Sequence, residues 1–63
     1  MQSEKQVLYD IYHDEDMYAW ERINRNTLEE HLQVFLDALK EYNEERAEKE
    51  RKRLNGKYNM NLT

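Results

Sequence analysis

The chain has 63 residues with one glycine, no proline and no cysteine, and its 14 acidic and 10 basic side chains give a net charge of −4. This length accommodates one small domain, and the absence of cysteine excludes disulfides, thiolate metal sites and a cysteine nucleophile. No apolar run approaches the ~18 residues of a membrane helix, and the first residues lack the apolar core of a signal peptide. We therefore expect a cytoplasmic protein without a membrane segment.

The composition predicts an all-α fold. Glycine and proline mark most turns of sheet proteins, and here Gly56 is the only one of either kind. Residues with high helix propensity dominate the chain. The mean hydropathy of −1.29 is also compatible with disorder, but seven aromatic residues and a regular apolar stripe favour a folded segment over residues 7–42. From residue 43 onward, a solvated helix and disorder both remain open.

A first helix is predicted from about Glu4 to Ile23. Ser3 followed by Gln6 is typical of a capping box at a helix start. The apolar stripe is interrupted at residues 14–16 and then resumes, which allows either a kink there or a restart capped by Asp14 or Asp16. The stripe consists of Val7, Leu8, Ile11 and Tyr12, followed by Met17, Tyr18, Trp20 and Ile23.

A long second helix is predicted from Leu28 to about Leu54. Thr27 and Glu30 form a second capping-box pattern, and Asn55 with Gly56 is typical of a helix end. Apolar residues recur at spacings of 4, 3, 4 and 3, which is the pattern of a heptad seam. This seam is formed by Leu28, Leu32, Phe35, Leu39 and Tyr42.

These two helices predict an antiparallel hairpin whose second helix projects past the first. We divide the chain into an acidic hairpin (1–45), a basic charged extension of the second helix (46–56) and a polar tail (57–63) of the kind that usually frays. The first part carries twelve acidic and four basic side chains, and the remainder carries two acidic and six basic ones. This split either solvates a small surface or steers the approach of a partner.

No catalytic or metal site is predicted. The run from His13 to Asp16 contains potential metal ligands, but no second ligand group lies at a diagnostic spacing and the run does not fit a calcium loop. Two helices offer no concave site for catalysis, and His31 is expected to be a boundary side chain beside the seam. We expect a protein that is not an enzyme and has no cofactor and no small-molecule substrate.

Binding to other proteins is the function that the pattern favours. A hairpin of this size is a marginal monomer, so the seam should serve self-association, as a homodimeric four-helix bundle, or should lie in the groove of a larger protein. Tyrosine and tryptophan beyond what one core needs are typical of binding surfaces. The residues expected to contact the partner are Tyr9, Asp14, Glu15, Asp16, Tyr18, Trp20, Arg46, Lys49 and Arg53.

The sequence therefore predicts a small helical interaction module: an adaptor, inhibitor or assembly factor that occupies a partner's surface. Short acidic chains without motifs are frequent among phage and mobile-element products, and that association makes a cytoplasmic accessory protein of a phage host one interpretation. Two alternatives remain. The acidic hairpin can mimic a phosphate backbone, or the basic end of the second helix can contact nucleic acid, although Glu48 and Glu50 dilute its charge.

Overall fold

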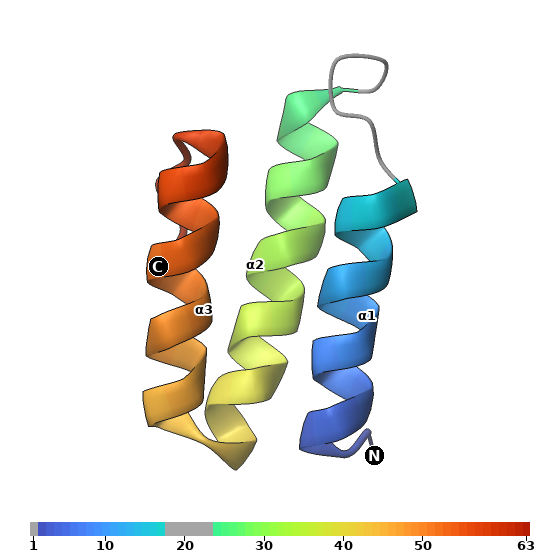
Figure 1. Cartoon of the computed structure of the whole chain (residues 1–63), viewed down its shortest axis with the longest axis vertical. Helices are drawn as coiled ribbons and strands as arrows, with labels where there is room; N and C mark the ends of the chain where they lie inside the picture. The colour runs from blue at the N-terminus through green and yellow to red at the C-terminus, as the bar shows by residue number, and fades with distance from the viewer. Residues whose placement is uncertain (1, 18–23) are drawn as a thin grey trace.

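The computed structural model describes residues 2–17 and 24–63, and it is all-helical with three helices over these residues. They are α1 (Glu4–Met17), α2 (Arg25–Tyr42) and α3 (Glu44–Tyr58). α2 packs against both α1 and α3 and lies between them in Figure 1. The last residues turn back along α3, so the described chain ends near the middle of that helix in this view. None of the described helices combines the length and the apolar composition needed to cross a bilayer.

α1 begins as its sequence predicts. The Ser3 hydroxyl oxygen accepts a hydrogen bond from the Gln6 backbone N–H at 3.2 Å, which satisfies one of the free donors at the helix start. Val7 and Ile11 are fully buried on one face. The helix continues through residues 14–16 to Met17, as the interpretation of a single helix expects, and does not restart there. The predicted continuation to Ile23 lies outside the described residues.

α2 begins three residues earlier than predicted. Its N-cap is Asn24, whose side-chain oxygen accepts a hydrogen bond from the Asn26 backbone N–H at 2.8 Å. Thr27 already lies inside the helix, so the prediction of a capping box at Thr27 is wrong. Asparagine is as strong an N-cap residue as threonine or better, which is consistent with a helix start at Asn24.

The predicted long second helix is also wrong, because the chain breaks at Asn43. This residue has extended backbone angles (φ −160°, ψ 96°), and its N–H closes α2 by bonding to the Leu39 carbonyl. Its side-chain oxygen caps α3 by accepting from the Arg46 N–H at 3.0 Å. Glu44 and Glu45 follow in the first turn of α3, where carboxylates favour the helix dipole. One asparagine therefore ends one helix and starts the next.

The break at Asn43 also shifts the buried face of the following helix by one residue. A continuous heptad count would place Arg46, Lys49 and Arg53 on the seam, and in the structure all three are exposed. The buried residues of α3 are Ala47, Glu50, Leu54 and Tyr58. Because of the turn at Asn43, α3 folds back onto α2 and buries a largely apolar face. A continuous helix would instead have placed its basic residues on the seam.

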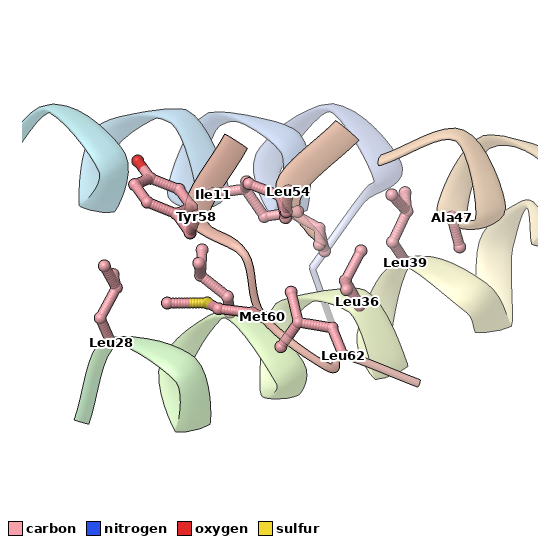
Figure 2. Close-up of a cluster of buried hydrophobic side chains, with 11 residues drawn as sticks. Ile11, Leu28, Leu36, Leu39, Ala47, Leu54, Tyr58, Met60 and Leu62 are labelled. Carbon is pink, nitrogen blue, oxygen red and sulfur yellow. The ribbon is translucent and has the colours of Figure 1, made fainter. Parts of the chain in front are cut away.

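Two of the last five residues, Met60 and Leu62, belong to the core. α3 runs through Gly56 to Tyr58, four residues beyond the predicted end at Leu54, and Asn59 then takes a left-handed conformation (φ 55°, ψ 48°), which asparagine tolerates better than most residues. Met60 and Leu62 are 5% and 3% exposed, so the polar tail, whose order the sequence leaves open, packs against the core. Figure 2 shows both side chains in one cluster with residues of all three helices. Its other members are Val7, Ile11, Leu28, Leu32, Leu36, Leu39, Ala47, Leu54 and Tyr58.

Replacing Asn43 by alanine tests the double cap. We expect Asn43→Ala to lower the free energy of unfolding by about 1–2 kcal/mol, because the substitution removes the side-chain acceptor at the start of α3. Urea unfolding followed by circular dichroism measures this change. Asn61→Ala is the matched control, because Asn61 is exposed and lies outside the helices. An unchanged unfolding midpoint for Asn43→Ala would show that the cap does not contribute.

Candidate functional site

A buried carboxylate on α1 holds α3 against α1. The Glu15 side chain is 4% exposed and accepts four hydrogen bonds from three residues of α3. The donors are Arg53 Nη2 at 2.6 Å and Nη1 at 3.3 Å, Lys57 Nζ at 2.9 Å and the Tyr58 hydroxyl at 3.1 Å. Charge-assisted hydrogen bonds of this kind are the stronger ones in proteins. We call these four residues the Glu15 cluster.

A second carboxylate extends the Glu15 cluster along α3. Glu50 accepts hydrogen bonds from the Tyr12 hydroxyl and from Arg53 Nε, both at 2.9 Å. Arg46 Nε lies 3.8 Å from the same carboxylate, and the Arg53 guanidinium carbon lies 5.3 Å from the centre of the Tyr12 ring. Every buried side-chain nitrogen and oxygen among the described residues has a hydrogen-bond partner. The network links side chains of α1 and α3 and so helps to position these two helices.

The network shifts the pKa values of its members. Burial alone raises the pKa of Glu15, but the hydrogen bonds and charges of Arg53 and Lys57 outweigh it and lower that pKa below 4.5. Hydrogen bonding to Glu15 raises the pKa of both Arg53 and Lys57. Burial, and then the neighbouring Glu50 carboxylate, raise the pKa of Tyr12. The charged forms of Glu15, Arg53 and Lys57 are therefore the forms that the fold favours.

A pH dependence of stability follows from the lowered pKa of Glu15. Its contribution is fully present above pH 4.5, the value of the unfolded group, and is lost as the pH falls through the lower pKa of the folded state. We expect Glu15→Gln to lower the free energy of unfolding at pH 7 by about 1–2 kcal/mol, a value reduced because Arg53 and Lys57 are 39% and 54% exposed.

Urea unfolding between pH 2 and pH 7 checks this dependence. The wild-type chain should lose stability more steeply than Glu15→Gln as the pH falls below 4.5. Asp16→Asn is the matched control, because Asp16 is the exposed neighbour of Glu15. Parallel pH profiles for the wild type and Glu15→Gln would contradict the role of the Glu15 cluster.

The predicted contact residues occupy very different environments. Glu15 and Arg53 bind each other and do not both face outward. Tyr9 and Asp16 are exposed, whereas Asp14 is half-buried with its carboxylate 3.5 Å from His31 Nδ1 on α2. Arg46 and Lys49 are exposed on α3. Tyr18 and Trp20 lie outside the described residues.

The predicted seam is largely buried within the chain. Leu28, Leu32 and Leu39 are fully buried, Phe35 is half-buried and Tyr42 is 36% exposed. Leu36, which the heptad pattern leaves out, is buried in the place expected for Phe35. The spacing of the four buried leucines is therefore 4, 4 and 3, which suits a helix that packs between two others.

A face of α1 and α2 carries most of the exposed large apolar side chains. Tyr9 stacks on His13 with ring centres 5.6 Å apart, and Met17 follows one turn later on the same side of α1. On α2, Val34 is 63% exposed beside Phe35, and His31 packs edge-on against the Phe35 ring. The 3.5 Å contact between Asp14 and His31 joins the two helices. We call this surface the outer α1/α2 face: Tyr9, His13, Asp14, Met17, His31, Val34 and Phe35.

A shallow hollow of about 430 Å³ lies on the α2 side of this face. Its lining consists of Glu30, His31, Val34 and Phe35, so it is apolar with a carboxylate at its margin. On α1, the exposed Asp16 adds a further acidic side chain close to Met17. The outer α1/α2 face is therefore an apolar surface bordered by negative charge.

Sequence reasoning missed several residues of this face, although one signal was present. The spacing of Tyr9, His13 and Met17 at i, i+4 and i+8 places them on one side of a helix, roughly opposite Val7 and Ile11. His31 and Val34 fall just beside the leucine stripe, and only the position of α1 shows which flank of α2 remains exposed. No family model, curated protein or solved structure matches the chain.

Proposed function

We propose that the protein is a small interaction module, an adaptor, inhibitor or assembly factor, that binds a larger protein through the outer α1/α2 face. The observation that carries this proposal is the exposure of Tyr9 (59%) and Val34 (63%) on two helices joined by the Asp14–His31 contact. The leucines of the predicted seam are already buried inside the chain, so this face provides the apolar area for a partner. Tyrosine is also among the residues enriched in interfaces.

The charge at the border of the face indicates the chemistry of the partner. Asp16 precedes the exposed Met17, and Glu30 lines the hollow with Val34, so these carboxylates favour a partner with an apolar patch flanked by lysine or arginine. A second copy of this chain would bring the same carboxylates together across a twofold axis, and juxtaposed like charges oppose association. We therefore propose a different protein as the partner and assign the homodimer the lesser weight.

The two nucleic-acid alternatives receive less support. Arg53 and Lys57 are engaged by Glu15, so they contribute less positive charge to a phosphate-binding surface. A mimic of a phosphate backbone requires a continuous run of carboxylates, and the outer α1/α2 face has apolar side chains at its centre. Neither alternative explains the exposed Tyr9 and Val34.

Site-specific photo-crosslinking tests the proposal. A benzophenone amino acid is placed at position 9, at position 34 or, as the control, at position 52, where the Lys52 side chain is 70% exposed on α3. Crosslinking in the cells that express the chain should yield the same partner from positions 9 and 34 and not from position 52. Identical products from all three positions, or a product that contains only a second copy of the chain, would contradict the proposal.

Reconstitution with the identified partner completes the test. We expect Tyr9→Ala to weaken binding by about 30-fold, as expected for an aromatic residue central to an interface, while the helicity and unfolding midpoint stay within error of the wild type. Lys52→Ala should bind as the wild type does. An equal loss of binding for both variants would place the interface elsewhere.

A further inference from the structure

Both histidines of the chain lie on the outer α1/α2 face. On α1, His13 stacks on Tyr9, with the two ring planes 13° apart. On α2, His31 packs edge-on against Phe35 with ring centres 6.4 Å apart, and its Nδ1 lies 3.5 Å from the Asp14 carboxylate. Imidazole is the side chain that ordinarily gains its charge between pH 8 and pH 5. The side chains that change charge in this range are therefore gathered on the face that we propose for binding.

His31 lies between carboxylates of two helices. Asp14 faces it from α1, and Glu30 lines the same hollow on α2. From α3, Arg53 and Lys57 reach α1 and bind the carboxylate of the Glu15 cluster. A proton on His31 therefore places a positive charge beside Asp14 and Glu30, and it gives Asp14 an ion-pair partner within the chain.

His13 lies among carboxylates of its own helix. Asp10 and Asp16 are three residues before and after it, so they lie on the adjacent turns of α1. Asp10 accepts hydrogen bonds from two glutamine side chains at 2.8 and 3.0 Å, and Asp16 is exposed. Residues 9–17 include four carboxylates, residues 27–35 include two, and neither stretch has a lysine or an arginine. A proton on either imidazole thus adds positive charge where the neighbouring charges along the helix are negative.

We propose that the outer α1/α2 face is a pH-sensitive binding surface, which holds a basic partner at neutral pH and releases it as His13 and His31 become protonated. This inference rests on the proposed function, in which carboxylates of the face attract lysine or arginine of the partner. At pH 7.5 these carboxylates are Asp14, Asp16 and Glu30, and at pH 5.5 two imidazolium groups offset much of their charge. An imidazolium also loses more hydration free energy than a neutral ring when a partner covers it. Both effects weaken binding as the pH falls.

The charge of the face can be measured on the full-length chain alone. Two nitroxide probes of equal size, one cationic and one neutral, enhance the nuclear relaxation of the protons that they approach. The ratio of the two enhancements at the methyl groups of Met17 and Val34 measures how strongly the face concentrates cations. At low salt this ratio should fall about twofold between pH 7.5 and pH 5.5, and it should stay constant in the double variant His13→Gln, His31→Gln. The exposed Lys52 side chain on α3 is the control position.

This range of pH leaves the fold in place. The contribution of the Glu15 cluster to stability is fully present above pH 4.5, and both measurements are made above that value. Circular dichroism at pH 5.5 and pH 7.5 should therefore give the same helicity for the wild type and for the double variant. A change in the cation ratio then reports the charge of the face and not unfolding.

Binding to the partner captured from positions 9 and 34 completes the test. Isothermal titration calorimetry at pH 7.5 and pH 5.5 gives the factor by which binding weakens, and the same factor for the double variant accounts for any titration of the partner. The factor for the wild type should exceed that for the double variant about tenfold. The difference should shrink at high salt, because salt screens exposed charges.

The outcomes distinguish this regulation from the proposed function. A cation ratio that is the same at both pH values, or that falls equally in the double variant, would overturn the pH-sensitive surface and leave the partner in place. Equal pH dependence of binding for the wild type and the double variant would also overturn it. Capture of no partner other than a second copy of the chain would reject the proposed function, and this regulation with it.

Discussion

Leu54→Ala is expected to lower the free energy of unfolding by about 2–5 kcal/mol, the range observed when a buried leucine is truncated. Leu54 has no exposed surface, and it belongs with Ile11 of α1 to the buried cluster of Figure 2. A chain of 63 residues has a total stability of roughly 3–9 kcal/mol, so this loss unfolds much of the population at 37 °C. Thermal and urea unfolding followed by circular dichroism measure it.

The control for this prediction lies two residues away on the same helix. The Lys52 side chain is 70% exposed and lies 3.7 Å from Glu48, an exposed pair that contributes little. Lys52→Ala should change the stability by less than about 0.5 kcal/mol. If Leu54→Ala were as mild as this control, α3 would not be part of the core and would project from the molecule.

Leu62→Ala is expected to lower the free energy of unfolding by about 2–4 kcal/mol. This is an unusually large effect for a residue so close to the end of the described residues. The side chain is 3% exposed in the common core, and Asn55 fixes the backbone at this residue with two hydrogen bonds. Asn61→Ala, one residue earlier and exposed, should change the stability by less than about 0.5 kcal/mol. Urea unfolding compares the two variants directly. Equal midpoints would mean that the segment after Tyr58 does not stabilise the fold.

The helical class and the main core stripe were predictable because they depend on local pattern. Ser3 caps α1 as expected, and Leu28, Leu32 and Leu39 are buried at the helical spacing that the sequence displays. Both features can be recognised from residues that are close in sequence: apolar residues that recur at helical spacing, and a capping residue at the helix start. The all-α prediction is confirmed for the described residues.

The break at Asn43 was missed because helix propensity was given more weight than capping. Every residue from Glu44 to Leu54 favours a helix, but propensity does not say whether two helical segments are continuous. The signal was an asparagine followed by two glutamates, which is typical of an N-cap and first turn. With the break unrecognised, the heptad count ran one residue out of phase through α3.

The arrangement of charge could not be predicted without the turn at Asn43. Acidic residues predominate in the first part of the chain and basic residues in the last. This separation favours the interpretation that the charges contact an external partner. Once α3 folds back, Glu15 meets Arg53 and Lys57 across 38 and 42 residues, so part of the charge split is neutralised inside the molecule. The tail was missed for a similar reason, because Met60 and Leu62 find their pockets only in a groove made by two other elements.

Nuclear Overhauser effects between the Tyr12 ring of α1 and the Arg53 side chain of α3, which lie 5.3 Å apart, test most directly that α3 folds back beside α1. Mixing isotopically labelled and unlabelled chains separates contacts within a molecule from contacts between molecules. The structure predicts contacts between Tyr12 and Arg53 within one chain, together with an interruption of the sequential helical amide contacts at Asn43. Uninterrupted helical contacts through Asn43, or Tyr12–Arg53 contacts found only between labelled and unlabelled chains, would contradict a fold completed by a single chain.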